Sequence, residues 1–337
     1  MQFALQGDYF KPLPMNAPFI LLINPWIYDF AAYDLWIKPL GLLSIAGILK
    51  RAGFGVHVID CLDVNHPEMQ QNHALPRPFR GGMGQGHFYQ QGIQKPDCLK
   101  KIPRNYKRYG MAPAIFENEL KALPRPQAVL VTSMMTYWYP GVFASIKIIK
   151  SVHPHVPVVL GGIYATLCPS HARLYSGADT VFTGPCNKSL ARILEAITGK
   201  PVHIAEDDFF SQPDCTLLSS KKALPILSSR GCPFRCIYCA SQLLHPGFHQ
   251  KKPAAIADYI ELWQGRGETT DFVFYDDALL VNPQQHIIPL LREVVKRNIS
   301  VRFHAPNGLH VRNIDAELAE LMMRAGFTTL RLGLETI

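Results

Sequence analysis

The sequence lacks several features that mark membrane and secreted proteins. No stretch of about 18 apolar residues runs without a charge, which argues against a membrane-spanning helix. Residues 1–8 have neither the basic nor the apolar region of a secretory signal peptide. Cysteine accounts for only eight of the 337 residues, and most are scattered, unlike a secreted disulfide framework. We therefore expect a cytoplasmic protein without a membrane partner.

Acidic residues are also fewer than basic ones. The chain has 26 Asp and Glu against 34 Lys and Arg, which gives a formal charge of +8. These basic residues do not form one long run, so we interpret them as a solvated face and do not expect a nucleic-acid partner. The apolar content of 48% and the length of 337 residues allow a sizeable core and two domains.

One short stretch, Ser229–Ala240, contains three cysteines in the pattern CxxxCxxC: Cys232, Cys236 and Cys239. Soft thiolate ligands at such spacing select zinc or iron–sulfur. A 4Fe–4S cluster usually takes four cysteines, so three would leave one iron free to hold something else. Two other interpretations stay open. Structural zinc could take His245 or His249 as a fourth ligand, and three unpaired cysteines could behave as small apolar residues.

The N-terminal half alternates between strand and helix patterns. We expect strands at 18–24, 55–60, 128–133, 156–162 and 180–184, and helices near 40–52, 140–152 and 188–198. Strand–helix–strand units of this kind build parallel sheets, so residues 1–199 should form a doubly wound α/β domain. Ligands bind such sheets at the carboxyl ends of the strands, where Ser133, Gly161 and Gly162 are placed.

Residues 64–115 interrupt this alternation. They are rich in His, Gln, Gly, Pro and basic residues. A loop of this length inside a domain is uncommon and often forms a lid or a binding loop. We expect either a surface insertion with a solvated basic face or a lid over an anionic ligand.

After a polar linker at 200–223, strand and helix patterns alternate again over 224–337. A strand at 224–229 leads into the cysteine stretch, and later strands are expected at 271–277, 301–305 and 328–335. Repeated β/α turns favour a barrel of parallel strands with ligands at its carboxyl ends. Asp276, Asp277, Asn307 and Glu335 fall at such ends.

The cysteine pattern and its position after a strand resemble the radical S-adenosylmethionine (radical SAM) superfamily. The resemblance implies a 4Fe–4S cluster on Cys232, Cys236 and Cys239, with S-adenosylmethionine chelated to the free iron. It places Tyr238 near the adenine, and Asp276 and Asp277 where the family holds the methionine ammonium. Asn307 and Glu335 would reach the ribose or the amino-acid part.

The N-terminal half is similar to the cobalamin-binding domain that precedes many radical SAM barrels. The similarity rests on Ser133-Met134-Met135 and the pair Gly161-Gly162, which in that family line the slot for the nucleotide tail of the cofactor. The D-x-H-x-x-G motif is missing, because Asn24–Asp29 contains no histidine. Bound cobalamin would therefore have no protein histidine on its cobalt.

Together these resemblances imply a Rossmann-like cobalamin-binding domain followed by a partial radical SAM (β/α) barrel. We expect an enzyme that cleaves S-adenosylmethionine to a 5′-deoxyadenosyl radical, with methyl transfer to carbon as the favoured reaction. It would use an electron donor such as flavodoxin or ferredoxin and an unidentified small-molecule or peptide substrate. No catalytic residue is assigned.

The strand pattern stops at 328–335, where the family's barrel usually continues. We therefore expect a barrel truncated after its fourth strand and incomplete as a catalyst. The alternatives are a non-catalytic cobalamin- and cluster-binding fragment or subunit that needs a second chain, and a zinc-stabilised α/β binding protein.

Overall fold

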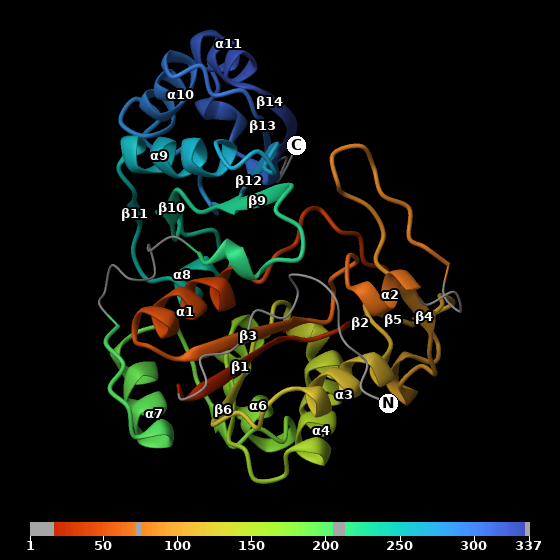
Figure 1. Ribbon diagram of the computed structural model, residues 1–337. Helices are drawn as coiled ribbons and strands as arrows, with labels where there is room; N and C mark the ends of the chain where they lie inside the picture. The colour runs from red at the N-terminus through yellow and green to blue at the C-terminus, as the bar shows by residue number, and fades with distance from the viewer. Residues whose placement is uncertain (1–16, 72–75, 205–212, 334–337) are drawn as a thin grey trace. The chain divides into compact units, whose positions relative to one another are not determined.

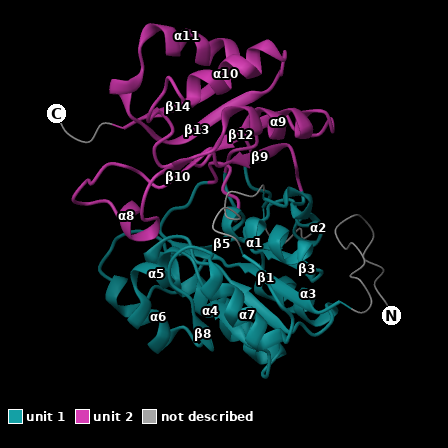
Figure 2. Cartoon of the chain, turned by 90° about the vertical axis from the view of Figure 1, so that its left-hand side faces the viewer, with its two compact units in different colours: residues 1–33, 39–79, 87–219 teal, residues 34–38, 80–86, 220–337 magenta. Residues whose placement is uncertain are grey.

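The computed structural model describes residues 17–71, 76–204 and 213–333. The chain divides into two compact units (Figure 2). Unit 1 contains residues 1–33, 39–79 and 87–219, and unit 2 contains residues 34–38, 80–86 and 220–337. Unit 2 thus includes two short segments from the N-terminal half. The sequence-based limits of 1–199, 200–223 and 224–337 stay a prediction.

Unit 1 is built on a five-stranded parallel sheet in the order β3-β1-β6-β7-β8. Its strands are β1 (Phe19–Asn24), β3 (Gly55–Asp60), β6 (Ala128–Val131), β7 (Val158–Leu160) and β8 (Thr180–Val181). In chain order this is strand 2-1-3-4-5, a doubly wound arrangement whose ligand site lies at the carboxyl ends where the strand order reverses.

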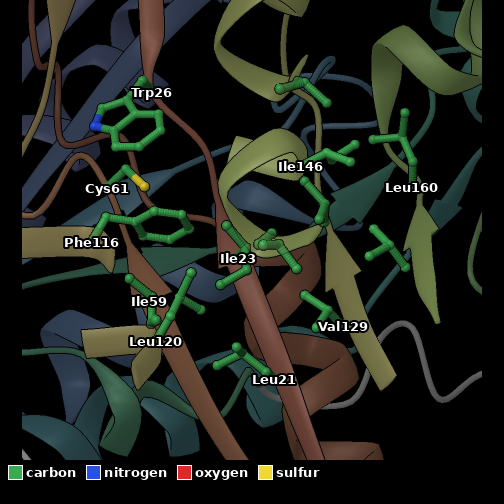
Figure 3. Close-up of a cluster of buried hydrophobic side chains, with 14 of the residues drawn as sticks. Leu21, Ile23, Trp26, Ile59, Cys61, Phe116, Leu120, Val129, Ile146 and Leu160 are labelled. Carbon is green, nitrogen blue, oxygen red and sulfur yellow. The ribbon is translucent and has the colours of Figure 1, made fainter. Parts of the chain in front are cut away.

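Helices cover both faces of this sheet (Figure 1). They are α1 (Leu40–Arg51), α2 (Pro67–Gln71), α3 (Pro113–Ala122), α4 (Tyr139–Val152), α5 (Ile163–Leu167), α6 (Pro169–Tyr175) and α7 (Lys188–Thr198). Alternate residues of a strand point to opposite faces, so β1 supplies two cores. Leu21 and Ile23 pack with residues of α3 and α4 (Figure 3), and Ile20 and Leu22 pack with α1 and α7. The expected doubly wound class is confirmed.

The insertion 64–115 is not structureless. Its strands β4 (Gln90–Gly92) and β5 (Lys107–Tyr109) pair antiparallel in the order β2-β5-β4 with β2 (Ile27–Asp29), which follows β1 directly. The insertion also contains α2, the start of α3 and the 3₁₀ turn η1 (Asp97–Leu99). It therefore forms a small second sheet beside the carboxyl end of β1. Further 3₁₀ turns of unit 1 are η2 (Thr136–Trp138) and η4 (Cys215–Leu217).

Unit 2 contains a four-stranded parallel sheet in the order β14-β13-β12-β9. Its strands are β9 (Ala223–Ile226), β12 (Asp271–Phe274), β13 (Arg302–Leu309) and β14 (Phe327–Leu332). The helices are α8 (Ser241–Leu244), α9 (Pro253–Gln264), α10 (Ile287–Lys296) and α11 (Ala316–Ala325), with the 3₁₀ turn η5 (Val311–Asn313). This succession of parallel strands and helices is the first part of a (β/α) barrel, as expected.

The two faces of this sheet are covered differently. Phe272 lies 6.3 Å from the ring of Tyr259 in α9, and Phe274 stacks on Phe327 at 5.6 Å, so these rings form the helix-facing core. On the opposite face, Trp36 stacks on His304 at 4.1 Å. The segment 34–38 therefore covers part of that second face, and Trp36 Nε1 donates to the carbonyl oxygen of Met83 in the segment 80–86.

Within the described ranges, no helix is both long and apolar enough to cross a membrane.

Candidate functional site

The cysteine loop of unit 2 starts and ends on a short antiparallel pair. Strand β10 (Ser229–Arg230) pairs with β11 (His249–Gln250), so residues 231–248 form a closed loop above β9. The expected single strand at 224–229 is therefore wrong in detail, because the backbone leaves β9 at Ile226 and joins a different sheet at Ser229. Gly231 has φ +77°, and a Cβ there would lie 2.1 Å from the carbonyl oxygen of Gly247. The crossing of the two loop stems thus requires glycine.

The three thiols of this loop differ in exposure. Cys232 is buried, whereas Cys236 and Cys239 are exposed. Burial raises the pKa of Cys232, and the nearby Asp277, Cys239 and Cys236 raise it further. Across the described ranges, no three His, Cys, Asp or Glu side chains are gathered closely enough to hold a metal ion.

Neighbouring side chains brace the loop from within. Gln242 donates from its Nε2 to the carbonyl oxygens of Cys232 and of Phe234, the latter at 3.3 Å. The ring of Phe234 packs edge-on against His310 at 4.8 Å and lies 4.6 Å from the guanidinium carbon of Arg312. The loop conformation therefore depends on contacts with residues that follow β13.

The histidines considered for a zinc site are engaged elsewhere. His245 Nδ1 lies 3.2 Å from Nε of Arg230, and burial, with the charge of Arg230, lowers the pKa of His245 to about 4. His249 belongs to β11. The guanidinium of Arg230 beside His245 also repels a metal cation, which weakens the zinc interpretation.

Asp276 and Asp277 follow β12 and have different surroundings. The side chain of Asp276 is buried and accepts hydrogen bonds from Ser228 and Ser229. Asp277 is exposed, and its charge raises the pKa of Cys232. Asp277 therefore lies beside the cysteine loop and can meet a ligand there, whereas the carboxylate of Asp276 is already satisfied by protein donors.

The other predicted residues of this half are placed as follows. Asn307 is exposed, and its Nδ2 donates to the carbonyl oxygen of Asp276 at 3.2 Å. It lies in β13 rather than after it, where the register shifts between Ala305 and Gly308; such bulges re-aim side chains. Tyr238 is 68% exposed on the cysteine loop, and Glu335 lies outside the described residues. The structure thus brings Cys232, Asp277 and Asn307 to one end of the sheet.

In unit 1, Ser133, Gly161 and Gly162 lie together at the carboxyl ends of β6 and β7. Ser133 Oγ donates to the carbonyl oxygen of Gly161 at 2.6 Å, and the amide of Ile163 donates to the carbonyl of Ser133 at 2.7 Å. Gly162 has φ +92° and ψ −165°. A Cβ there would lie 2.4 Å from the Ser133 carbonyl oxygen, whereas one on Gly161 would reach only Phe182, at 3.9 Å. Contacts between Ser133 and Gly162 thus fix the turn between β7 and α5. Of the two glycines, only Gly161 has open space next to its Cα.

The sequence did not single out Arg108. This β5 residue is 8% exposed, and its Nη2 donates to Oε1 of Gln91 at 2.5 Å. Its buried Nε has no hydrogen-bond partner in the described part of the chain. An arginine in a run of basic residues gives no signal of burial, because its burial depends on the pairing of β5 with β2 and β4.

These features can be compared with the groups that the sequence implies. Three thiols in one glycine-containing loop suit an iron–sulfur cluster by their chemistry, although they would have to draw closer together to share it. Asp277 beside them suits a ligand ammonium. In unit 1, Gly161 leaves space at the carboxyl end of β7, where ligands bind doubly wound sheets.

Comparison with known proteins agrees with this geometry. Residues 226–337 match the family model of the radical SAM superfamily. This segment contains the cysteine loop and most of the parallel sheet of unit 2, and its match confirms the predicted resemblance to that superfamily.

Relatives and solved structures extend the similarity to the rest of the chain. The chain is 21% identical to cytidylyl-2-hydroxyethylphosphonate methyltransferase of Streptomyces wedmorensis over 97% of its own length and 66% of that protein. It is 23% identical to anaerobic magnesium-protoporphyrin IX monomethyl ester cyclase of Rubrivivax gelatinosus, over 57% of its own length and 40% of that protein. The radical S-adenosylmethionine methyltransferase TsrM of Kitasatospora setae, solved with tryptophan and a SAM analogue, superposes with a TM-score of 0.63 at 18% identity, covering 95% of this chain and 60% of TsrM.

A second TsrM structure, with cobalamin and a [4Fe-4S] cluster bound, gives a TM-score of 0.62. At 18% identity this likeness shows that both proteins share the same two-part α/β fold. The chain spans between 40% and 66% of the lengths of the two relatives named above.

Proposed function

We propose that this chain is a cobalamin-binding radical SAM enzyme. Cys232, Cys236 and Cys239 would hold a 4Fe–4S cluster, and S-adenosylmethionine would bind to the free iron beside them. The observation that carries the proposal is the meeting of Cys232, Asp277 and Asn307 at the carboxyl ends of parallel strands in the radical SAM segment. When bound and reduced, the cluster would supply the electron that cleaves S-adenosylmethionine to methionine and a 5′-deoxyadenosyl radical.

The residues of the chain would bind and orient this cofactor. Asp277 is exposed next to the thiol of Cys232, so its carboxylate can pair with the methionine ammonium. Asn307 donates to the carbonyl of Asp276 through Nδ2, and its Oδ1 would accept a hydrogen bond from a ribose hydroxyl. Tyr238, exposed just before Cys239, offers a ring on which the adenine can stack.

Unit 1 would bind cobalamin at the carboxyl ends of its sheet. The support is the doubly wound strand order and the space at Gly161. The segment Asn24–Asp29 contains no histidine, so the cobalt would lack a histidine ligand from this segment. Methyl transfer to carbon is the reaction we favour, since two of the similar proteins are methyltransferases by name.

The first test is anaerobic reconstitution of the full chain with iron and sulfide. We expect a brown protein with about four irons per chain, and loss of that absorption when Cys232, Cys236 or Cys239 is replaced by Ala. Cys98→Ala is the matched control, because Cys98 is also exposed but lies in unit 1. One equivalent of zinc with no uptake of iron would refute the cluster assignment.

The second test measures 5′-deoxyadenosine after addition of dithionite and S-adenosylmethionine to the reconstituted chain. Release of 5′-deoxyadenosine that depends on all three cysteines supports an enzyme. An intact cluster without any release supports the alternative, a non-catalytic fragment or subunit that needs a second chain. A flavodoxin or ferredoxin is the electron donor that we propose to replace dithionite.

Cobalamin binding is tested separately by titration with hydroxocobalamin and by EPR of the reduced cob(II)alamin form. We expect saturable binding and a spectrum without the splitting that a histidine nitrogen would give. Absence of saturable binding to the folded chain would refute this part and leave the cluster assignment unaffected.

A further inference from the structure

A buried network joins the end of β12 to the base of the cysteine loop. Oδ1 of Asp276 accepts hydrogen bonds from Oγ of Ser228 at 2.7 Å and Oγ of Ser229 at 2.6 Å. The backbone amide of Ser229 also donates to Oδ1, and the amide of Ser228 donates to Oδ2 at 3.2 Å. One carboxylate therefore receives four donors from two consecutive residues.

All members of this network are withdrawn from solvent. Asp276 is 3% exposed, and Ser228 and Ser229 are 0% exposed. His286, 1% exposed, places its Nε2 2.9 Å from Oγ of Ser228, and burial lowers the pKa of His286 to about 4. Its ring is therefore neutral. Burial raises the pKa of Asp276, whereas the serine donors lower it, and Lys251 interacts electrostatically with the same carboxyl group.

The network also reaches the other stem of the loop. The carbonyl oxygen of Ser228 accepts from the amide of Lys251 at 2.9 Å, and Lys251 directly follows β11. Because β10 and β11 pair with each other, Asp276 fixes both ends of the segment that contains the three cysteines. Ser229 lies only three positions before Cys232.

From this geometry we infer that Asp276 is a positioning residue that anchors the cysteine loop to β12 and does not itself bind the S-adenosylmethionine ammonium. This inference rests on the proposed function, and it divides the roles of the two neighbouring acids. Asp276 sets the direction in which the loop leaves the sheet, and Asp277 faces the ligand. Charge-assisted bonds to a buried carboxylate are among the stronger hydrogen bonds in proteins, and one partner left unpaired is costly.

The test compares Asp276→Asn with two matched variants in the full chain. Asp277→Asn changes the neighbouring acid, and Asp271→Asn changes another buried acid at the opposite end of β12. After reconstitution, we expect Asp276→Asn to lose iron to a chelator about tenfold faster than the unchanged chain, as the loss of one charge-assisted bond implies. Asp271→Asn should retain iron at the original rate.

A spectroscopic measurement separates positioning from general stability. We expect Asp276→Asn to change the EPR signal of the reduced cluster even without S-adenosylmethionine. Asp277→Asn should keep that signal and lose only the change that S-adenosylmethionine causes. Asp271→Asn should lower the unfolding temperature and leave the signal unchanged.

Hydrogen exchange makes the test independent of the cluster. In the apo chain, peptides that contain Ser228 and Ser229 should exchange about tenfold faster in Asp276→Asn, because a charged acceptor is lost from both amides. If the unchanged chain takes up no iron, the proposed function fails. The hydrogen-exchange measurement then tests by itself whether Asp276 anchors the loop. If Asp276→Asn does not fold, the double variant Ser228→Ala/Ser229→Ala replaces it and should show the same direction of change. Exchange and iron retention equal to those of the unchanged chain would overturn the inference.

Discussion

Gly162 allows a sharp prediction, because its neighbour Gly161 is a control of the same residue type. Gly162 has φ +92° and ψ −165°, a region that only glycine populates readily. A Cβ at this position would lie 2.4 Å from the carbonyl oxygen and 2.6 Å from the amide nitrogen of Ser133. Both atoms belong to the backbone and cannot rotate away.

The cost of Gly162→Ala can be estimated from these two effects. Backbone strain in this region costs about 1–3 kcal/mol, and overpacking against a fixed backbone adds about 1–3 kcal/mol. We therefore expect the free energy of unfolding to fall by about 2–6 kcal/mol. In Gly161→Ala the new Cβ makes only an ordinary contact at 3.9 Å with Phe182, so the change should be within about 0.5 kcal/mol.

The assay is equilibrium unfolding in urea, followed by circular dichroism, for the unchanged chain and both variants. The midpoint should shift strongly for Gly162→Ala alone. If the two alanine variants unfold together, the turn between β7 and α5 does not have the backbone conformation described above. A bulky replacement at Gly162 is for the same reason a poor probe of cobalamin binding, since it would disturb Ser133 before any ligand is present.

Two more predictions concern the face of unit 2 that Trp36 covers. Trp36→Ala should lower the free energy of unfolding by about 3–5 kcal/mol, since the buried indole stacks on His304 and donates to the carbonyl of Met83 at 2.7 Å; urea unfolding that matches the unchanged chain would contradict this. The second prediction concerns Asp271. Burial opposes the ionisation of its carboxyl group, but hydrogen bonds with His304 and Arg302 hold its pKa well below the ordinary value. A carboxyl whose folded pKa is depressed stabilises the fold above its unfolded pKa and loses this contribution as pH falls through the folded pKa. The stability advantage over Asp271→Asn should thus be constant from pH 5 to 8 and shrink below about pH 4; an advantage that grows in acid would refute the assignment.

Periodicity predicted the parts of the fold that are local in sequence. The expected helix near 40–52 corresponds to α1, and the expected strand at 55–60 corresponds to β3. The strand at 18–24 and the helix near 188–198 correspond to β1 and α7 within two residues. Each of these signals is contained within one element, so no information about partners was needed.

Pairing between distant segments was not predictable in this way. Nothing in the sequence Lys107–Tyr109 indicates a strand. These three residues form a strand only because β2 and β4 pair with them on either side. The segment 34–38 likewise reads as a loop after β2. Its place in unit 2 depends on Trp36 stacking on a histidine far along the sequence.

The candidate site shows the same limit at the level of single residues. Strand ends indicated that Ser133, Gly161 and Gly162 would meet, and they do. The sequence could not indicate that Ser133 would be buried and bonded rather than open to a ligand. That outcome depends on the conformation of Gly162, which composition does not report.

The two acids after β12 show why neighbouring residues of one type need not share a role. Asp276 is buried at the junction with β9, where Ser228 and Ser229 supply four donors, whereas Asp277 is exposed. Burial raises the pKa of Asp276, and the serine donors, which replace water, act in the opposite direction. With these bonds made, Asp276 has little capacity left for a ligand cation. The exposed acid keeps its full acceptor capacity beside Cys232. A pair of acids at the end of a barrel strand can thus serve two needs of one site: a fixed loop for the metal and a free carboxylate for the cofactor.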